Sequence, residues 1–311
     1  MTQEGSSAAF ASSAPSAAAP AQAVVTVAGT GLITGLPCVA QIERLAPPSE
    51  DDGLAHGIVF DLGDGVMIPA SLAAVMHADR GVTLGDARSG QTLSIVEHFL
   101  AACALSGARH LRVRITGAPE LPILDGSADP WTDALRRLGF DALEANAETQ
   151  PVAPLRQAVF CRHHESACVY ALPAPYFQLT YAVDFPHPGL RDVWVNWDSS
   201  RDGIEWISPA RTFGFVRELP LLQAKGLARG VSADNTLGLT DEGGFTAPLR
   251  LDDEPVRHKM LDLLGDLMLA GVSPLRLGAR VIAVGAGHAA HIAFARQLRA
   301  VMDVSGKALH S

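Results

Sequence analysis

Cysteine is scarce in this chain, and its placement excludes a zinc ribbon or a CxxC redox motif. The 311 residues include four cysteines, none of them at CxxC or zinc-finger spacing: Cys38, Cys103, Cys161 and Cys168. Isolated thiols favour a cytosolic protein with reduced cysteines. The segment CRHHESAC (residues 161–168) could form a soft-metal site, but it lies in an alternating run, so we expect a hairpin with a polar tip.

Positive charge is scarce as well. The chain has 24 Lys and Arg against 33 Asp and Glu, which gives a formal net charge of -9 at pH 7. Because nucleic-acid binding depends on clustered basic side chains, this composition excludes a broad nucleic-acid surface. An anionic small ligand would need a local basic site instead.

Long apolar runs are missing. No window reaches about 18 uninterrupted apolar residues, so the sequence predicts no spanning helix and no stable membrane insertion. The first 23 residues are rich in Ala, Ser and Pro, contain no Lys or Arg, and lack the apolar core of a secretory signal. We therefore expect a disordered leader over 1–23 and a cytoplasmic protein.

A dinucleotide-binding glycine motif is also absent, because GTGLITG (residues 29–35) has the wrong spacing and opens no helix. A hydrophobic content of 48% can supply a substantial core. Strand-like and helix-like runs mix in both halves of the chain, which favours the α+β class. We expect one half over 24–143, a linker over 144–154 and a second half over 155–305. The expected helices span 92–107, 129–140, 255–270 and 289–302.

The third of these expected helices carries an ordered polar row. In PVRHKMLDLLGDL (residues 255–267), His258, Asp262 and Asp266 follow at steps of four, and the apolar residues occupy the opposite arc. One interpretation is a solvated polar face. The other is a metal site, since His and Asp at i and i+4 can reach one ion.

A second pair of residues gives weight to the metal interpretation. In SIVEHFLAA (residues 94–102), Glu97 and His98 are neighbours on an expected helix, so His98 could bind a metal while Glu97 faces a water. Taken alone, this pair is better explained by a surface Glu beside a core-edge His. Together with His258 and Asp262 it predicts a His2Asp catalytic zinc site between the two halves. Asp266 would then orient a histidine.

Two further segments carry candidate groups. In VGAGHAAH (residues 284–291), either His288 or His291 could be a general acid, or could serve local hydrogen bonding at a helix start. SPARTFGF (residues 208–215) offers a cation, a hydroxyl and an aromatic ring for an anion, an oxyanion and a sugar, in the order Arg211, Thr212 and Phe213. Lys259 beside the expected zinc ligands indicates a phosphate or carboxylate on the substrate.

In chain order, SIVEH, LPILDGSA, DFPHP, SPARTFGF, EPVRHKMLDLLGDL and GAGHAAH resemble the zinc-dependent UDP-(3-O-acyl)-N-acetylglucosamine deacetylases of lipid A biosynthesis, the LpxC family. The resemblance runs from about residue 24 to 302. It implies two similar two-layer α/β sandwich domains, a cytoplasmic monomer, and an acyl-chain passage formed by an insertion within 216–250. It implies zinc held by His98, His258 and Asp262.

The resemblance also implies a role for each remaining candidate. Glu97 would be the general base, Thr212 would stabilise the oxyanion, and His288 paired with Asp266 would be the acid that protonates the leaving amine. Lys259 and Phe213 would contact the acylated UDP-amino-sugar, and Arg211 is a further candidate contact.

Two positions depart from the family pattern. Ile33 stands where the family has a histidine, and Gly285 stands where it has a lysine that helps to hold the nucleotide phosphates. The leading hypothesis is the family reaction. A second is a paralogous zinc deacetylase acting on another N-acetylated sugar, and a third is a binding protein without turnover. The intact base and acid argue against the third hypothesis.

Overall fold

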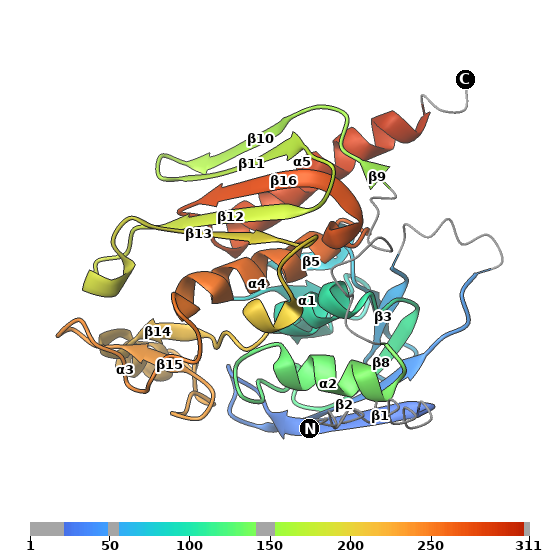
Figure 1. Ribbon diagram of the computed structural model, residues 1–311. Helices are drawn as coiled ribbons and strands as arrows, with labels where there is room; N and C mark the ends of the chain where they lie inside the picture. Colours follow the sequence, from blue (N-terminus) through green and yellow to red (C-terminus); the bar gives the residue numbers. More distant parts are fainter. Residues whose placement is uncertain (1–21, 49–55, 141–152, 308–311) are drawn as a thin grey trace, which may run out of the picture.

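The computed structural model describes residues 22–48, 56–140 and 153–307, so most of the expected leader and most of the expected linker lie outside the described residues. Two sheets form the outer layers, and helices fill the space between them (Figure 1). The described helices are α1 (Glu97–Ser106), α2 (Asp129–Arg137), α3 (Leu219–Ala224), α4 (Glu254–Met268) and α5 (His288–Lys307). The α+β class is confirmed.

The first sheet has the strand order β1-β2-β8-β3-β4, and a separate three-stranded sheet runs β5-β6-β7. In β8, Leu111, Val113 and Ile115 are buried in alternation, as expected of a sheet covered on one face. The bounds are β1 (Val24–Thr30), β2 (Pro37–Arg44), β3 (Ile58–Asp61), β4 (Met67–Pro69), β5 (Val75–His77), β6 (Thr83–Gly85), β7 (Thr92–Ser94) and β8 (Leu111–Gly117).

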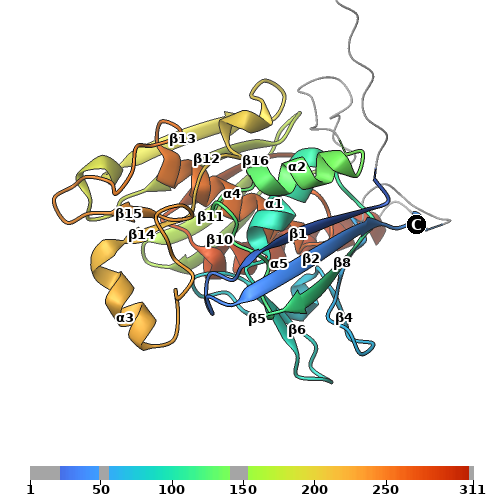
Figure 2. The same cartoon turned by 90° about the horizontal axis from the view of Figure 1, so that it is seen from below.

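The second sheet has the order β10-β11-β16-β12-β13, with β9 beside β16. Its strands are β9 (Ala153–Pro154), β10 (Val159–His164), β11 (Ala167–Pro173), β12 (Gln178–Val183), β13 (Val193–Asp198) and β16 (Leu277–Val284). The insertion expected in 216–250 carries α3 and β15 (Leu237–Leu239), and β15 pairs in parallel with β14 (Phe213–Phe215), which comes just before the insertion. It projects at one end of the molecule (Figure 2).

The two sheets repeat one topology. In each, a hairpin (β1–β2, β10–β11) is followed by a second hairpin (β3–β4, β12–β13), and a later strand (β8, β16) enters between them. That strand is antiparallel to one neighbour and parallel to the other in both sheets. A helix precedes it and another follows it, so α1 corresponds to α4 and α2 to α5. Two similar sandwiches are therefore present, as expected.

One expected helix start was wrong, and the structure bears on two further interpretations. The helix expected over 92–107 begins at Glu97, because Thr92–Ser94 pair with β6 as a strand. The row on α4 is not a solvated polar face, since His258, Asp262 and Asp266 are all buried. The CRHHESAC segment is a β10–β11 hairpin with an exposed tip, as expected, and contributes to no metal-binding group among the described residues.

Candidate metal and catalytic site

Helices α1 and α4 pack against each other in the middle of the molecule (Figure 1). The closest approach is at Gly265, where a Cβ atom would collide with the backbone carbonyl of Glu97. Only glycine permits this contact, which brings the start of α1 against the polar row of α4. The sequence motif LLGDL therefore contains a packing requirement, Gly265, beside its one carboxylate, Asp266.

The backbone just before α1 is strained. Ile95 has φ of 59°, in the left-handed region that β-branched residues avoid. Its N–H donates to Val82 O at 3.0 Å, and its side chain is buried. Such strain persists only where the surroundings over-determine it. Here it turns the chain so that the next residues, Val96 and Glu97, enter α1 facing the interior.

One group of three buried side chains could hold a metal ion: His98, His258 and Asp262. Asp262 Oδ1 lies 3.3 Å from His258 Nε2 and 3.7 Å from His98 Nε2. Two ligands on one zinc ion, each at about 2.0–2.1 Å, are about 3.4 Å apart in a tetrahedral site. The spacing of these atoms therefore fits one tetrahedral ion.

The hydrogen bonds around the group leave the same atoms available. His258 Nδ1 donates to Ala210 O at 2.9 Å, so Nε2 carries the lone pair. Asp262 Oδ2 accepts from Lys259 Nζ at 2.8 Å, whereas the buried Oδ1 has no hydrogen-bond partner among the described residues. A buried, unpaired carboxylate oxygen facing two imidazole nitrogens is what a metal-binding position requires. The donor set of two nitrogens and one oxygen suits zinc.

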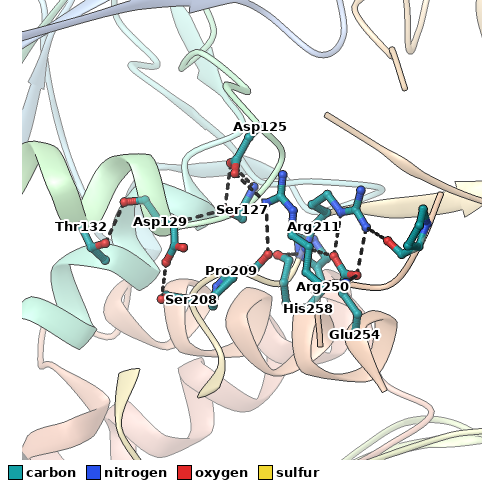
Figure 3. Close-up of polar contacts among 12 residues, drawn as sticks. Asp125, Ser127, Asp129, Thr132, Ser208, Pro209, Arg211, Arg250, Glu254 and His258 are labelled. Carbon is teal, nitrogen blue, oxygen red and sulfur yellow. Dashed lines mark hydrogen bonds and ion pairs between the residues drawn. The ribbon is translucent and has the colours of Figure 1, made fainter. Parts of the chain in front are cut away.

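A network of charged side chains supports the segment that holds His258 (Figure 3). Arg211 is 5% exposed, and its guanidinium donates to both oxygens of Glu254, at 2.8 and 3.1 Å. Arg250 joins the same region to Asp125 at 2.6 Å. The Arg211 guanidinium is thus committed to Glu254 and to Pro248 O, and it does not line the neighbouring cavity.

A backbone hydrogen bond holds one of the two carboxylate oxygens of Glu97. Oε2 accepts from Val82 N at 3.1 Å, and the side chain is 3% exposed. Burial raises the pKa of Glu97 to about 7. A carboxyl group with this pKa can both accept and release a proton near neutral pH.

His288 lies at the start of α5, on the other side of Asp262. Its Nδ1 is 2.8 Å from Asp266 Oδ2, and its Nε2 is 3.6 Å from Asp262 Oδ2. Burial alone would lower the pKa of His288, but the carboxylates of Asp266 and Asp262 outweigh it and raise the pKa to about 9. The ring therefore holds a proton at neutral pH. Asp266, His288 and His291 form a second cluster of potential ligands, which hydrogen bonds already link.

A cavity of about 530 Å³ opens beside these groups. Thr212 and Phe213 form its inner end, and Phe213 also packs edge-on against His258, with ring centroids 6.1 Å apart. Its walls are largely apolar and come from both halves and from the insertion, including Ile33, Ile95, Leu222 and Val231. This shape suits a ligand with an aliphatic chain.

The two positions that depart from the family pattern have clear structural settings. Ile33 lines the cavity, in a loop whose Ile33 and Thr34 N–H groups donate to the buried carboxylate of Glu120 at 2.7 and 2.9 Å. Gly285 has φ of 56°, and a Cβ there would collide with Ser166 O in the β10–β11 hairpin. A larger residue at 285 would require this hairpin to move.

The structure brings most of the predicted site residues together. Those around the buried centre or at the end of the cavity are Glu97, His98, Thr212, Phe213, His258, Lys259, Asp262, Asp266 and His288. Arg211 is paired with Glu254 and does not line the cavity. Sequence reasoning missed Glu120, and it missed Tyr181, which contacts His291. The only signal for Tyr181 was its inward phase in an alternating strand.

Two helices that bring two histidines, an aspartate and a buried glutamate together beside a cavity define the kind of site used by metal-dependent hydrolases. Residues 21–300 match the family model described as LpxC, UDP-3-O-acyl N-acetylglycosamine deacetylase. The chain belongs to this family.

Curated relatives agree with this assignment. A protein of Thermosynechococcus vestitus is 40% identical over 239 residues, covering 77% of this chain and 80% of the relative. One from Nostoc sp. is 36% identical, over 88% of this chain and 95% of the relative, and one from Leptospira biflexa is 38% identical, over 88% and 86%. Each is named UDP-3-O-acyl-N-acetylglucosamine deacetylase.

Proposed function

We propose that this protein is a zinc-dependent deacetylase that hydrolyses the acetamide of UDP-3-O-acyl-N-acetylglucosamine, the committed step of lipid A biosynthesis. Membership of the family and the names of its relatives support the reaction. The observation that carries the zinc assignment is the unpaired Asp262 Oδ1 facing the Nε2 atoms of His98 and His258. A nucleotide-linked substrate is consistent with the cytoplasmic location that the sequence predicts.

His98, His258 and Asp262 are the proposed zinc ligands. A zinc ion held there would supply Lewis acidity, which favours both the attack of water on the amide and the negative charge that develops on its carbonyl oxygen. The Ala210 carbonyl and Lys259 orient two of the three ligands.

Glu97 is the proposed general base. Its free carboxylate oxygen would take a proton from the attacking water, while Val82 N–H keeps the other oxygen in place. The hydroxyl of Thr212, at the end of the cavity, would donate a hydrogen bond to the developing oxyanion.

His288 is the proposed acid. Asp266 accepts the hydrogen of its Nδ1, which leaves the Nε2 proton for the leaving amine of the sugar. Breaking the C–N bond yields acetate and a free amine, and the amine nitrogen receives this proton. The raised pKa of His288 keeps the proton on the ring until the bond breaks.

Substrate binding is proposed for Phe213, which lines the cavity, and for Lys259, whose Nζ lies 2.8 Å from Asp262 Oδ2. The apolar cavity would take the 3-O-acyl chain. Arg211 has a different proposed role from the one expected. Because its guanidinium is paired with Glu254, we assign it to positioning the segment that carries Thr212.

Mass spectrometry of the zinc-loaded protein with UDP-3-O-acyl-N-acetylglucosamine tests the proposal directly, with a chelated sample as control. We expect loss of one acetyl group, and we expect the chelator to abolish it. A protein shown to hold zinc that forms no product would contradict the substrate assignment. A protein that does not bind zinc would contradict the metal assignment.

One alternative substrate class has a specific observation behind it. Gly285 cannot carry a cationic side chain in this backbone, and Ile33 places an apolar group in the cavity. A paralogous deacetylase acting on an N-acetylated sugar without a diphosphate would not need such a cation. Competition between the UDP-linked substrate and a UDP-free acylated N-acetylglucosamine separates the two, since the family reaction requires preference for the nucleotide.

A further inference from the structure

A buried polar chain continues behind His288, beyond the groups assigned above. His291, on the first turn of α5, places Nδ1 2.8 Å from Asp266 Oδ2. Its Nε2 lies 2.8 Å from the hydroxyl of Tyr181, on β12. Tyr181, His291 and Asp266 are all 0% exposed. The burial of Tyr181 and His291 needs an explanation, because burying polar groups costs free energy that their hydrogen bonds must offset.

The hydrogens in this chain can be counted. The Tyr181 hydroxyl has one hydrogen and two neighbours, Ala286 O at 2.7 Å and His291 Nε2 at 2.8 Å. If the phenol donates to Ala286 O, His291 must donate from both nitrogens. If it donates to His291 Nε2, the neutral ring donates from Nδ1. In both arrangements His291 Nδ1 donates to the Asp266 carboxylate.

The Asp266 carboxylate depends on this donor. Its Oδ2 receives the Nδ1 hydrogens of both His288 and His291, whereas its buried Oδ1 has no hydrogen-bond partner among the described residues. Without His291, only His288 itself would hold the group that orients His288. The carboxylate could then rotate about its last side-chain bond.

Tyr181 acts on the same histidine from its backbone side. Its hydroxyl lies against Ala286 O, two residues before His288, and the next residue of β12, Ala182, accepts from Gly285 N at 2.9 Å. The loop that leads into α5 is thus attached to β12 at two points. Tyr181 and His291 together contact both supports of His288, its carboxylate partner and its loop.

We propose that His291 and Tyr181 are positioning residues for the reaction, which act through Asp266 and the 285–287 loop to hold His288 where it delivers its proton. The inference rests on the proposed function, because it assigns no chemistry to either residue on its own. It requires that their loss lowers kcat without changing substrate binding, since neither side chain lines the cavity.

The test compares variants of the zinc-loaded full chain. His291→Leu removes both hydrogen bonds, and we expect kcat to fall about 10- to 100-fold with KM and zinc content unchanged. His291→Asn can keep a donor at the Nδ1 position and should restore most of this loss. Tyr181→Phe removes one hydroxyl and should also lower kcat. Tyr170→Phe is the matched control, because Tyr170 lies on the exposed face of β11 and should have no effect.

A double-mutant cycle distinguishes positioning from general destabilisation. If His291 acts through Asp266, His291→Leu will cause no further fall in kcat when Asp266 is already Asn. An equal fall in both backgrounds, or a raised KM with unchanged kcat, would overturn the proposal. Should His291→Leu not fold, Tyr181→Phe in the same two backgrounds decides the question.

A second measurement does not depend on turnover. The Nδ1–H of His288 is buried and hydrogen-bonded, so its NMR signal should be sharp and far downfield in the native protein and should broaden in His291→Leu. An unchanged signal would contradict the positioning role. If the native protein has no activity on the UDP-linked substrate but the signal behaves as expected, the proposed function fails while the structural inference stands.

Discussion

At the scale of single residues, three side chains of the site, His258, Asp262 and Glu97, each use one polar atom in a hydrogen bond within the protein. His258 Nδ1 donates to Ala210 O, which leaves Nε2 available. Asp262 Oδ2 accepts from Lys259 Nζ, which leaves Oδ1 available, and Glu97 Oε2 accepts from Val82 N. Each of these hydrogen bonds fixes a tautomer or a rotamer before any ligand binds. The arrangement therefore separates the proposed metal ligands from the proposed general base.

This separation predicts different results for two substitutions. Glu97→Gln keeps an oxygen that can accept from Val82 N but removes the base, so we expect zinc content to stay the same while kcat falls about 10²- to 10⁴-fold. His258→Ala should lose both zinc and activity. Metal analysis beside the kinetic assay checks this, and equal loss of zinc in the two variants would show that the roles are wrongly divided.

At the scale of elements, the contact between α1 and α4 depends on the missing side chain of Gly265. Gly265→Ala would push a Cβ into the Glu97 carbonyl, so the helices must separate. We expect a loss of about 1–3 kcal/mol in the free energy of unfolding, together with reduced activity. Chemical denaturation measures the first quantity.

Gly214→Ala is the control for this substitution. Gly214 has nothing within 4 Å of an added Cβ, so its replacement should change stability by no more than about 0.5 kcal/mol. If both variants lose the same stability, the close approach of the helices is not what makes position 265 sensitive.

The elements that the sequence could predict are those with a strong local signal. The alternation in β8 and the periodic apolar run of α4 located both elements to within about two residues, and the spacing of His258 and Asp262 predicted that these two side chains lie together. Thr92–Ser94 looked like the start of a helix because its strand character comes from pairing with β6, which is a tertiary effect.

Other features lay beyond local patterns. The burial of the polar row on α4 depends on α1 and α5 packing against it, and the pairing of Arg211 with Glu254 joins residues 43 positions apart. The resemblance supplied the candidate site residues, but it could not show that Arg211 is absent from the cavity lining. Nor did the sequence reveal the repeated topology, because strand order is set by long-range pairing.

At the scale of the whole molecule, the proposed ligands come from both halves, with His98 on α1 and His258 and Asp262 on α4. An ion that binds only when both helices are in place must stabilise the whole fold. We expect zinc to raise the thermal midpoint, by an amount equivalent to about 2.7 kcal/mol at a free concentration 100 times Kd. Calorimetry with and without chelator checks this, and His258→Ala, measured in parallel, should show no shift.

The junction between the halves also contains a buried histidine, His56, that makes the fold sensitive to acid. His56 donates from Nε2 to Met268 O at 2.8 Å and accepts from Ile58 N at Nδ1, so only the neutral ring fits. Burial first, and the nearby His110, lower its pKa to about 4. The unfolded chain binds this proton near pH 6.5 and the folded chain does not, so stability falls as the pH drops from 6.5 towards 4.

This difference in pKa between the folded and unfolded chain predicts that His56 lowers the free energy of unfolding by roughly 2 kcal/mol between pH 7 and pH 5. The variant His56→Gln can still donate to Met268 O but does not titrate. Its stability should therefore depend less steeply on pH over this range, as urea unfolding at several pH values would show. Parallel pH profiles for the two proteins would mean that another group accounts for the acid sensitivity.

The repeated strand order of the two sheets has a consequence for ancestry. Duplication of a shorter sequence would produce such a repeat, with α1 and α4 as the equivalent helices of the two copies. The proposed ligand set could not have existed in one copy, because it needs both helices. If the halves share an ancestor, that ancestor bound the ion as a pair of identical chains or not at all. The different roles of the two halves then arose after they were joined.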